Sequence, residues 1–161
     1  MGKTLLVVWH SRTGGARQMA EAAVADEPDV TVRLMRAEDA AASDLLAADG
    51  YIFAAPENLA ALSGPMKDFF DRCYYPVLGR IEGRPFATMV CAGSDGENAV
   101  RQIARIATGW RLRQIAEPII VCTRAQTPEA ILAPKIVAPA DLARCAELGA
   151  AFAAGLDAGI Y

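Results

Sequence analysis

The sequence has few of the residues from which protein metal centres are usually built. It contains one histidine, His10, and four widely spaced cysteines, Cys73, Cys91, Cys122 and Cys145. No two cysteines form a CxxC pair, and a single histidine does not complete a usual zinc template with them. We therefore expect no metal site, and we expect the cysteines to be buried free thiols in a reducing cytoplasm.

The sequence also lacks a strong charge imbalance and a long hydrophobic run. Its 16 basic and 19 acidic residues give a net charge of -3. A dedicated nucleic-acid or anionic-membrane binder would carry a basic patch, so this balance argues against both kinds of partner. No uncharged stretch approaches the ~20 apolar residues of a membrane span, and the N-terminal segment has no basic region followed by a cleavage site. These observations predict a cytoplasmic protein with no nucleic-acid and no membrane partner.

Short apolar runs alternate with longer amphipathic segments along the 161 residues, of which 53% are hydrophobic and 22% charged. This length suits a single domain, residues 1–161, with a packed core. Apolar, partly β-branched runs predict strands at residues 4–9, 30–35, 51–55, 86–92 and 118–123. Helical spacing of apolar residues predicts helices at residues 14–25, 40–48, 65–74, 97–108 and 139–154, with a proline-rich surface loop at 124–139. The alternation predicts an α/β domain with a parallel sheet.

In such a sheet, binding sites form in the loops beyond the carboxyl ends of the strands. The loop after the first strand reads HSRTGGARQMA, residues 10–20. Its glycines, the hydroxyls of Ser11 and Thr13 and the following helix N-terminus suit a phosphate, to which Arg12 or Arg17 would add charge. The alternative is an ordinary tight turn in which Thr13 caps the helix. The loop contains no GxGxxG motif, no GxxxxGK[ST] motif and no cysteine, which excludes a dinucleotide fingerprint, a P-loop and a cysteine phosphatase.

The loop after the third strand carries the most specific motif. Its sequence, PENLAALSGPMKDFFDRCYY at residues 56–75, resembles the second flavin loop and following helix of the flavodoxin-like NAD(P)H:quinone and FMN reductases. The shared pattern is a proline at the strand end, then Ser-Gly-Pro-hydrophobic-Lys and a helical Asp-Arg, here Pro56, Ser63, Gly64, Pro65, Met66, Lys67, Asp71 and Arg72. SRTGGA at residues 11–16 is similar to the phosphate loop of that family, with Ala16 in place of its last hydroxyl residue. CAGSDGEN at residues 91–98 stands where the glycine-rich third loop of the family follows the fourth strand.

This resemblance implies a flavodoxin-like three-layer α/β/α fold with a five-stranded parallel sheet of order 2-1-3-4-5, in its short-chain form. It implies FMN as cofactor, held by three loops whose residues are Ser11, Arg12, Thr13, Gly14, Gly15, Ala16, Pro56, Glu57, Asn58, Leu59, Ala92, Gly93, Ser94, Asp95, Gly96 and Asn98. It implies no catalytic side chain, because the flavin performs the chemistry. Ser94 or Asp95 has an alternative role as a helix cap, and His10, a lone histidine at a strand end, is expected to be structural.

Two functions from different classes fit this reading. The first is an oxidoreductase that passes hydride from NAD(P)H through FMN to a small-molecule acceptor such as a quinone or a flavin. The alternative is a flavodoxin-type electron-transfer protein that docks to redox partners, and a flavin-free binding scaffold is a more distant third. Electron-carrying flavodoxins typically stack aromatic side chains on the ring, whereas residues 56–64 and 92–98 contain no Phe, Tyr or Trp. The sequence therefore favours the reductase.

The resemblance also implies a homodimer or homotetramer. Near the end of the 65–74 helix lies an apolar and aromatic cluster, Tyr74, Tyr75, Pro76, Val77 and Leu78. Such a cluster is richer than the surface of a monomer usually is. We therefore expect residues 65–80 to contribute to the contact between subunits.

Overall fold

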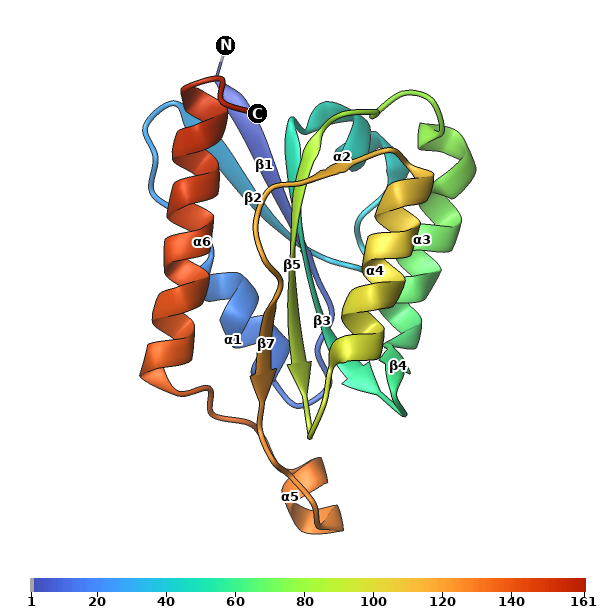
Figure 1. The fold of residues 1–161 in the computed structure, drawn as a ribbon, viewed down its shortest axis with the longest axis vertical. Helices are drawn as coiled ribbons and strands as arrows, with labels where there is room; N and C mark the ends of the chain where they lie inside the picture. The colour runs from blue at the N-terminus through green and yellow to red at the C-terminus, as the bar shows by residue number, and fades with distance from the viewer. Residues whose placement is uncertain (1) are drawn as a thin grey trace.

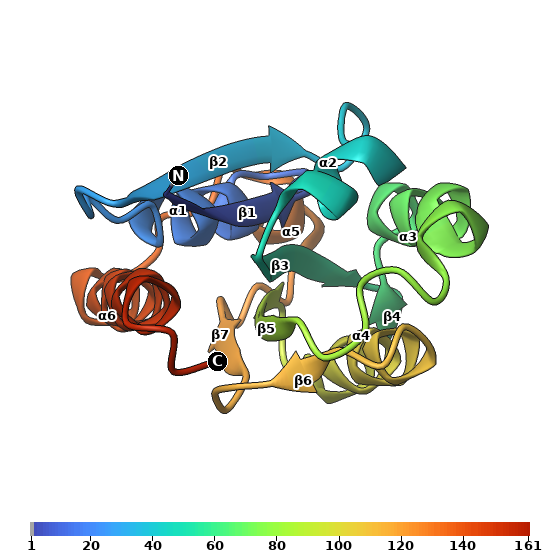
Figure 2. The same cartoon turned by 90° about the horizontal axis from the view of Figure 1, so that it is seen from above.

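A computed structural model describes residues 2–161 and shows a sheet between two layers of helices (Figure 1). One face of the sheet is covered by α1 (Gly15–Ala22) and α6 (Pro139–Asp157). The other face is covered by α2 (Ala42–Ala47), α3 (Gly64–Val77) and α4 (Glu97–Gly109). Figure 2 shows α6 on one side of the strands and α3 and α4 on the other. The predicted three-layer α/β/α architecture is confirmed.

Five parallel strands make up the body of the sheet: β1 (Lys3–Trp9), β2 (Val30–Arg36), β3 (Gly50–Asn58), β5 (Pro85–Ala92) and β7 (Ile119–Cys122). Their spatial order is β2-β1-β3-β5-β7, which confirms the order 2-1-3-4-5. In register, Val8 pairs with Met35 of β2 and Phe53 of β3. All five carboxyl ends lie at the same edge, so the loops that follow β1, β3 and β5 meet there.

The central strands β1, β3 and β5 are largely buried on both faces because helices cover both faces. Leu5, Leu6, Val7 and Val8 of β1 are all fully buried, as the apolar run at its position predicts. On the α3 and α4 face, the rings of Phe53, Phe69, Phe70 and Phe86 pack together, and Trp110 packs against Phe70 inside this core. In the described residues the four cysteines are free thiols, of which Cys122 is half-buried and the other three are buried.

Three short elements were not expected from the sequence. β3 continues to Asn58, where we expected a loop, and pairs with antiparallel β4 (Ala61–Leu62). β6 (Arg113–Gln114) pairs with the first residues of β5, so two short strands, β6 and β7, share the edge position beside β5.

The predicted surface loop at residues 124–139 is not irregular throughout, because it holds the third unexpected element. It contains a helical turn, α5 (Pro128–Leu132), which Figure 1 shows beyond the carboxyl end of β7. The turn forms because Thr127 Oγ1 accepts the Ala130 N–H at 3.2 Å and Pro128 occupies the first helical position. Between residues 2 and 161, no helix combines the length and the apolar character that crossing a membrane requires.

Candidate cofactor-binding site

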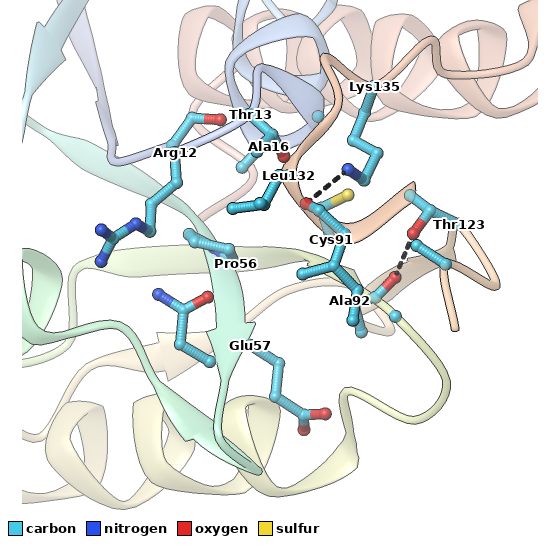
Figure 3. A pocket seen from close by; sticks show the side chains of 16 residues that line it. Arg12, Thr13, Ala16, Pro56, Glu57, Cys91, Ala92, Thr123, Leu132 and Lys135 are labelled. Carbon is cyan, nitrogen blue, oxygen red and sulfur yellow. Dashed lines mark hydrogen bonds between the residues drawn. The ribbon is translucent and has the colours of Figure 1, made fainter. Parts of the chain in front are cut away.

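A pocket of about 200 Å³ opens at the carboxyl edge of the sheet. Its walls come from the N-terminus of α1, the ends of β3, β5 and β7, and the α5 segment (Figure 3). The lining residues are Ser11, Arg12, Thr13, Gly15, Ala16, Pro56, Glu57, Asn58, Cys91, Ala92, Gly93, Thr123, Ala125, Ile131, Leu132 and Lys135. The structure thus brings together members of all three loops that the sequence singled out.

The first loop presents free backbone donors to this pocket. Gly14 occupies the N-cap position of α1 with φ of 95°, and its N–H donates to Ser11 Oγ at 3.0 Å. The first helical hydrogen bond runs from Gln18 N to Gly14 O, so the N–H groups of residues 15–17 have no acceptor inside the helix. Free N–H groups and the positive end of the helix dipole suit an anion. The alternative in which Thr13 caps the helix is wrong, because Gly14 holds that position and no described side chain caps it.

Gly15 allows α1 to start directly against β5. A Cβ atom at this position would overlap with Cys91 Sγ, so a larger residue would push the helix N-terminus away from the strand. Burial raises the pKa of the Cys91 thiol to about 11. At neutral pH Cys91 is therefore a protonated, poorly nucleophilic wall residue.

The structure separates the two arginines that the sequence offered as additional charge for a phosphate. Arg12 lines the pocket and has no ion-pair partner within residues 2–161. Arg17 lies outside the pocket, where its Nε donates to Glu21 Oε1 at 2.7 Å and its guanidinium lies 5.8 Å from the Trp9 ring centroid. Of the two arginines, Arg12 is therefore the one placed to meet an anion here.

The second loop is the β3–β4 hairpin, and Pro56, Glu57 and Asn58 on its first strand line the pocket. One oxygen, Glu57 Oε2, is buried and has no hydrogen-bond partner in the described chain. A buried acceptor without a donor is costly, so this oxygen fits a ligand that carries an N–H group. Leu59 lies at the tip of the hairpin, fully exposed and outside the pocket.

Two side chains of α4 brace the hairpin. Leu59 and Ala60 have φ of 51° and 59°, a left-handed pair that costs energy for residues other than glycine. Asn98 Nδ2 donates to Ala60 O and Gln102 Oε1 accepts from Leu62 N, both at 2.6 Å. Asn98 does not line the pocket, and its hydrogen bond holds the hairpin instead. Gln102 was not singled out from the sequence, since only the fold places it beside residue 62.

The third loop contributes Ala92 and Gly93 to the pocket, whereas Ser94, Asp95 and Gly96 lie outside it. The Asp95 carboxylate accepts a long hydrogen bond, 3.4 Å, from Glu97 N at the start of α4. The contact lies at the first turn, but Gly96 is the N-cap residue and no described side chain caps α4, so the helix-cap alternative for Ser94 or Asp95 is wrong. Gly96 is the N-cap residue with φ of 89°, and a Cβ there would lie 2.8 Å from Ile120.

His10 connects the first and second loops from outside the pocket. It is buried, and its Nδ1 lies 2.9 Å from the hydroxyl of Ser63, the N-cap residue of α3. Burial lowers the pKa of His10, so the neutral ring is favoured, and Glu38 at 3.9 Å from Nε2 opposes that shift. His10 does not line the pocket, in agreement with its expected structural role. Residues 2–161 contain no group of three His, Cys, Asp or Glu side chains placed to hold a metal ion.

The family model described as NADPH-dependent FMN reductase matches residues 21–126. The chain belongs to this family. The matched region includes the second and third loops and begins after the first. As a family member, the chain is an FMN-binding flavoprotein.

A flavodoxin from Aquifex aeolicus (strain VF5) is 33% identical over 99 residues. The match covers 60% of this chain and 53%, about half, of that relative. A flavodoxin from the domain Archaea superposes with a TM-score of 0.74 and 20% identity, covering 95% of this chain and 98% of the other. A WrbA-like flavodoxin from Agrobacterium tumefaciens gives a TM-score of 0.68 and 22% identity, with coverage of 95% and 96%. These structural matches show the flavodoxin-like fold.

Proposed function

We propose that this FMN reductase family member transfers electrons from NAD(P)H to a small-molecule acceptor, a quinone or a flavin. When bound, FMN supplies the chemistry, since its ring accepts a hydride and passes the electrons on. The protein contributes position, polarity and access. The pocket at the carboxyl edge is the proposed site, supported by the N–H groups without a helical acceptor at the start of α1 and by the family match.

The residues have separate roles in this proposal. The N–H groups of residues 15–17, the Thr13 hydroxyl and the Arg12 guanidinium would bind the phosphate. Glu57 Oε2, which has no donor of its own, would accept a hydrogen bond from the imide N–H of the ring. The backbone of Ala92 and Gly93 would form the part of the pocket wall that the third loop contributes.

The observation that favours a reductase over an electron carrier is the absence of aromatic residues from the pocket. None of the described residues that line it is Phe, Tyr or Trp. A ring that is not stacked against an aromatic side chain leaves a face accessible to a nicotinamide and then to an acceptor. The flavodoxin relative supports the carrier alternative, so the experiment must distinguish the two.

The deciding experiment is an anaerobic titration of the FMN-loaded chain with NADH and with NADPH, followed by a quinone. A reductase loses its flavin absorbance with either nicotinamide and regains it with the quinone. A chain that binds FMN but is not reduced by either nicotinamide would instead support the carrier. Absence of FMN binding at any concentration would contradict both functions.

Replacement of Thr13 tests the proposed phosphate position. Thr13→Ala removes a hydroxyl from the pocket and is expected to weaken FMN binding by about 1–3 kcal/mol, the value of a hydrogen bond to a charged group. Riboflavin has no phosphate, and its affinity is expected to change far less. Dissociation constants measured by flavin fluorescence test this, and equal losses for both ligands would place the phosphate elsewhere.

A further inference from the structure

The segment of residues 124–138, between β7 and α6, forms one wall of the pocket and is held at both ends. At its start, Thr123 N donates to Ala92 O at 2.8 Å and Arg124 N to Gly93 O at 2.7 Å. At its end, Lys135 N donates to Thr13 O at 2.8 Å. The 124–138 segment therefore connects the third loop with the first.

The middle of the 124–138 segment has little packing of its own. None of the residues of α5 is buried, and Leu132 is 77% exposed. Ile131 and Leu132 nevertheless line the pocket, as Figure 3 shows for Leu132, which is drawn between Ala16 and Pro56. Lys135 closes the helical turn, since its Nζ lies within 2.9 Å of the carbonyl oxygens of residues 130, 131 and 133. The position of this wall must therefore depend on contacts at the ends of the segment.

One side chain, Gln18 of α1, makes most of those contacts at the returning end. Its Nε2 donates to Lys135 O at 2.7 Å and to Gly14 O at 2.8 Å. Its Oε1 accepts from Val137 N at 3.1 Å, and Val137 is itself buried. Both the nitrogen and the oxygen of the Gln18 amide are thus hydrogen-bonded, Nε2 to two carbonyl oxygens and Oε1 to one N–H group. Gln18 itself does not line the pocket.

We infer that Gln18 is a positioning residue that couples the 124–138 segment to the first loop and thereby controls how long FMN stays bound. The amide holds the N-cap carbonyl of Gly14 and the returning backbone at residues 135 and 137 in one arrangement. Displacement of the segment would move Leu132 and Ile131 away from the pocket and open it to solvent. This inference rests on the proposed FMN site, and its test separates the two.

The test compares FMN dissociation rates of the loaded wild-type chain with those of Gln18→Met, Leu132→Ala and the double variant. Methionine keeps the length and helix propensity of glutamine but removes the three hydrogen bonds. FMN is expected to leave Gln18→Met about tenfold faster, the effect of losing one to two net hydrogen bonds. If Gln18 acts through the wall, the double variant releases FMN no faster than the more affected single variant, because the wall is already displaced. Glu21→Ala, one turn further along the exposed side of α1, is the matched control and should release FMN at the wild-type rate.

Trypsin digestion of the FMN-free chain provides a readout that does not depend on the cofactor. Cleavage after Arg124 or Lys135 should be faster in Gln18→Met than in wild type and Glu21→Ala. Wild-type release and cleavage rates in Gln18→Met, or strictly additive effects on release in the double variant, would overturn the inference and leave the proposed FMN site intact. A wild-type chain that does not bind FMN would overturn both.

Discussion

His10 is a buried ionisable side chain whose charge state the fold determines. It faces Ser63 through Nδ1 and Glu38 through Nε2, with Arg12 and Arg36 as the nearby positive charges. Burial, together with the two arginines, outweighs Glu38 and lowers the pKa below the ordinary value of 6.5. Folding therefore favours the neutral ring.

This lowered pKa predicts a loss of stability in mild acid. Below about pH 6.5 the unfolded state takes up a proton at His10 that the folded state does not yet bind. The free energy of unfolding therefore decreases as the pH is lowered, until the pH reaches the pKa of His10 in the folded state. His10→Asn keeps a side-chain polar atom near Ser63 but cannot titrate. Urea denaturation at about pH 7.5 and about pH 5.5 should show a larger decrease for wild type than for the variant. Equal decreases would mean that His10 does not contribute to the pH dependence.

The four cysteines differ in accessibility. Burial raises the pKa of Cys73, Cys91 and Cys145 to about 11, whereas Cys122 is half-buried. A thiol-specific reagent should therefore label Cys122 first in the native chain, because the other three thiols are buried and their raised pKa keeps them protonated. Peptide mapping after brief labelling identifies the site, with the unfolded chain as the control in which all four react. Labelling of Cys91 as fast as Cys122 would contradict its assignment as a buried wall residue.

Helices α1 and α6 approach each other closely at Gly149. A Cβ atom at this position would overlap with the Ala23 carbonyl group, which is backbone and cannot rotate away. Gly149→Ala is expected to lower the free energy of unfolding by about 1–3 kcal/mol, the usual cost of overpacking, although alanine favours helices.

A second helical glycine provides the matched control for Gly149→Ala. At Gly109 the nearest atom to a new Cβ is a ring carbon of Tyr74 at 3.7 Å, an ordinary contact distance. Gly109→Ala should therefore leave stability unchanged or raise it by up to about 1 kcal/mol. Thermal or urea denaturation of both variants measures the difference, and a stable Gly149→Ala would show that the two helices can separate at no cost.

The accuracy of sequence-based prediction differs between elements for physical reasons. The run at residues 4–9 predicts β1 well because a strand buried on both faces must be continuously apolar. The proline content of residues 124–139 predicts a loop, yet Thr127 and Pro128 carry the local signal of a helix start, which the count of prolines obscured. β4 has two residues and no periodicity to detect, so its pairing with Glu57 and Asn58 follows only from the fold.

In the pocket, too, some residues can be predicted from the sequence pattern and others depend on contacts that only the fold creates. Residues of the loops after β1, β3 and β5 were predicted to lie together because parallel strands end at one edge. Ile131, Leu132 and Lys135 were not, since their place depends on a contact between residues 117 positions apart, Gln18 and Lys135. No local pattern in the sequence encodes that contact.

For the whole molecule, the proposed homo-oligomer depends on a smaller surface than the sequence suggested. The cluster belongs to the last turn of α3 and its end, where Val77 is buried while Tyr75 and Leu78 are 80% and 46% exposed. We expect the wild-type chain to exceed its monomer mass of 17.1 kDa in light scattering at micromolar concentration. Tyr75→Glu should shift it toward the monomer because a charge is costly in an apolar contact, whereas Tyr75→Phe should not. A monomeric wild-type chain would exclude this assembly.

The division of the edge strand into β6 and β7 affects how folded chains can aggregate. Residues 115–118 separate the two pieces, and Pro118 has no N–H to donate, so this edge offers no long row of free backbone groups to an incoming strand. The opposite edge, β2, runs through seven residues, and its side chains include the charged Arg33 and Arg36. Charged side chains on an edge strand discourage intermolecular β-pairing. Any growth of cross-β structure from the folded chain would therefore have to start at the β2 edge. An added strand would there have to accommodate the guanidinium groups of Arg33 and Arg36.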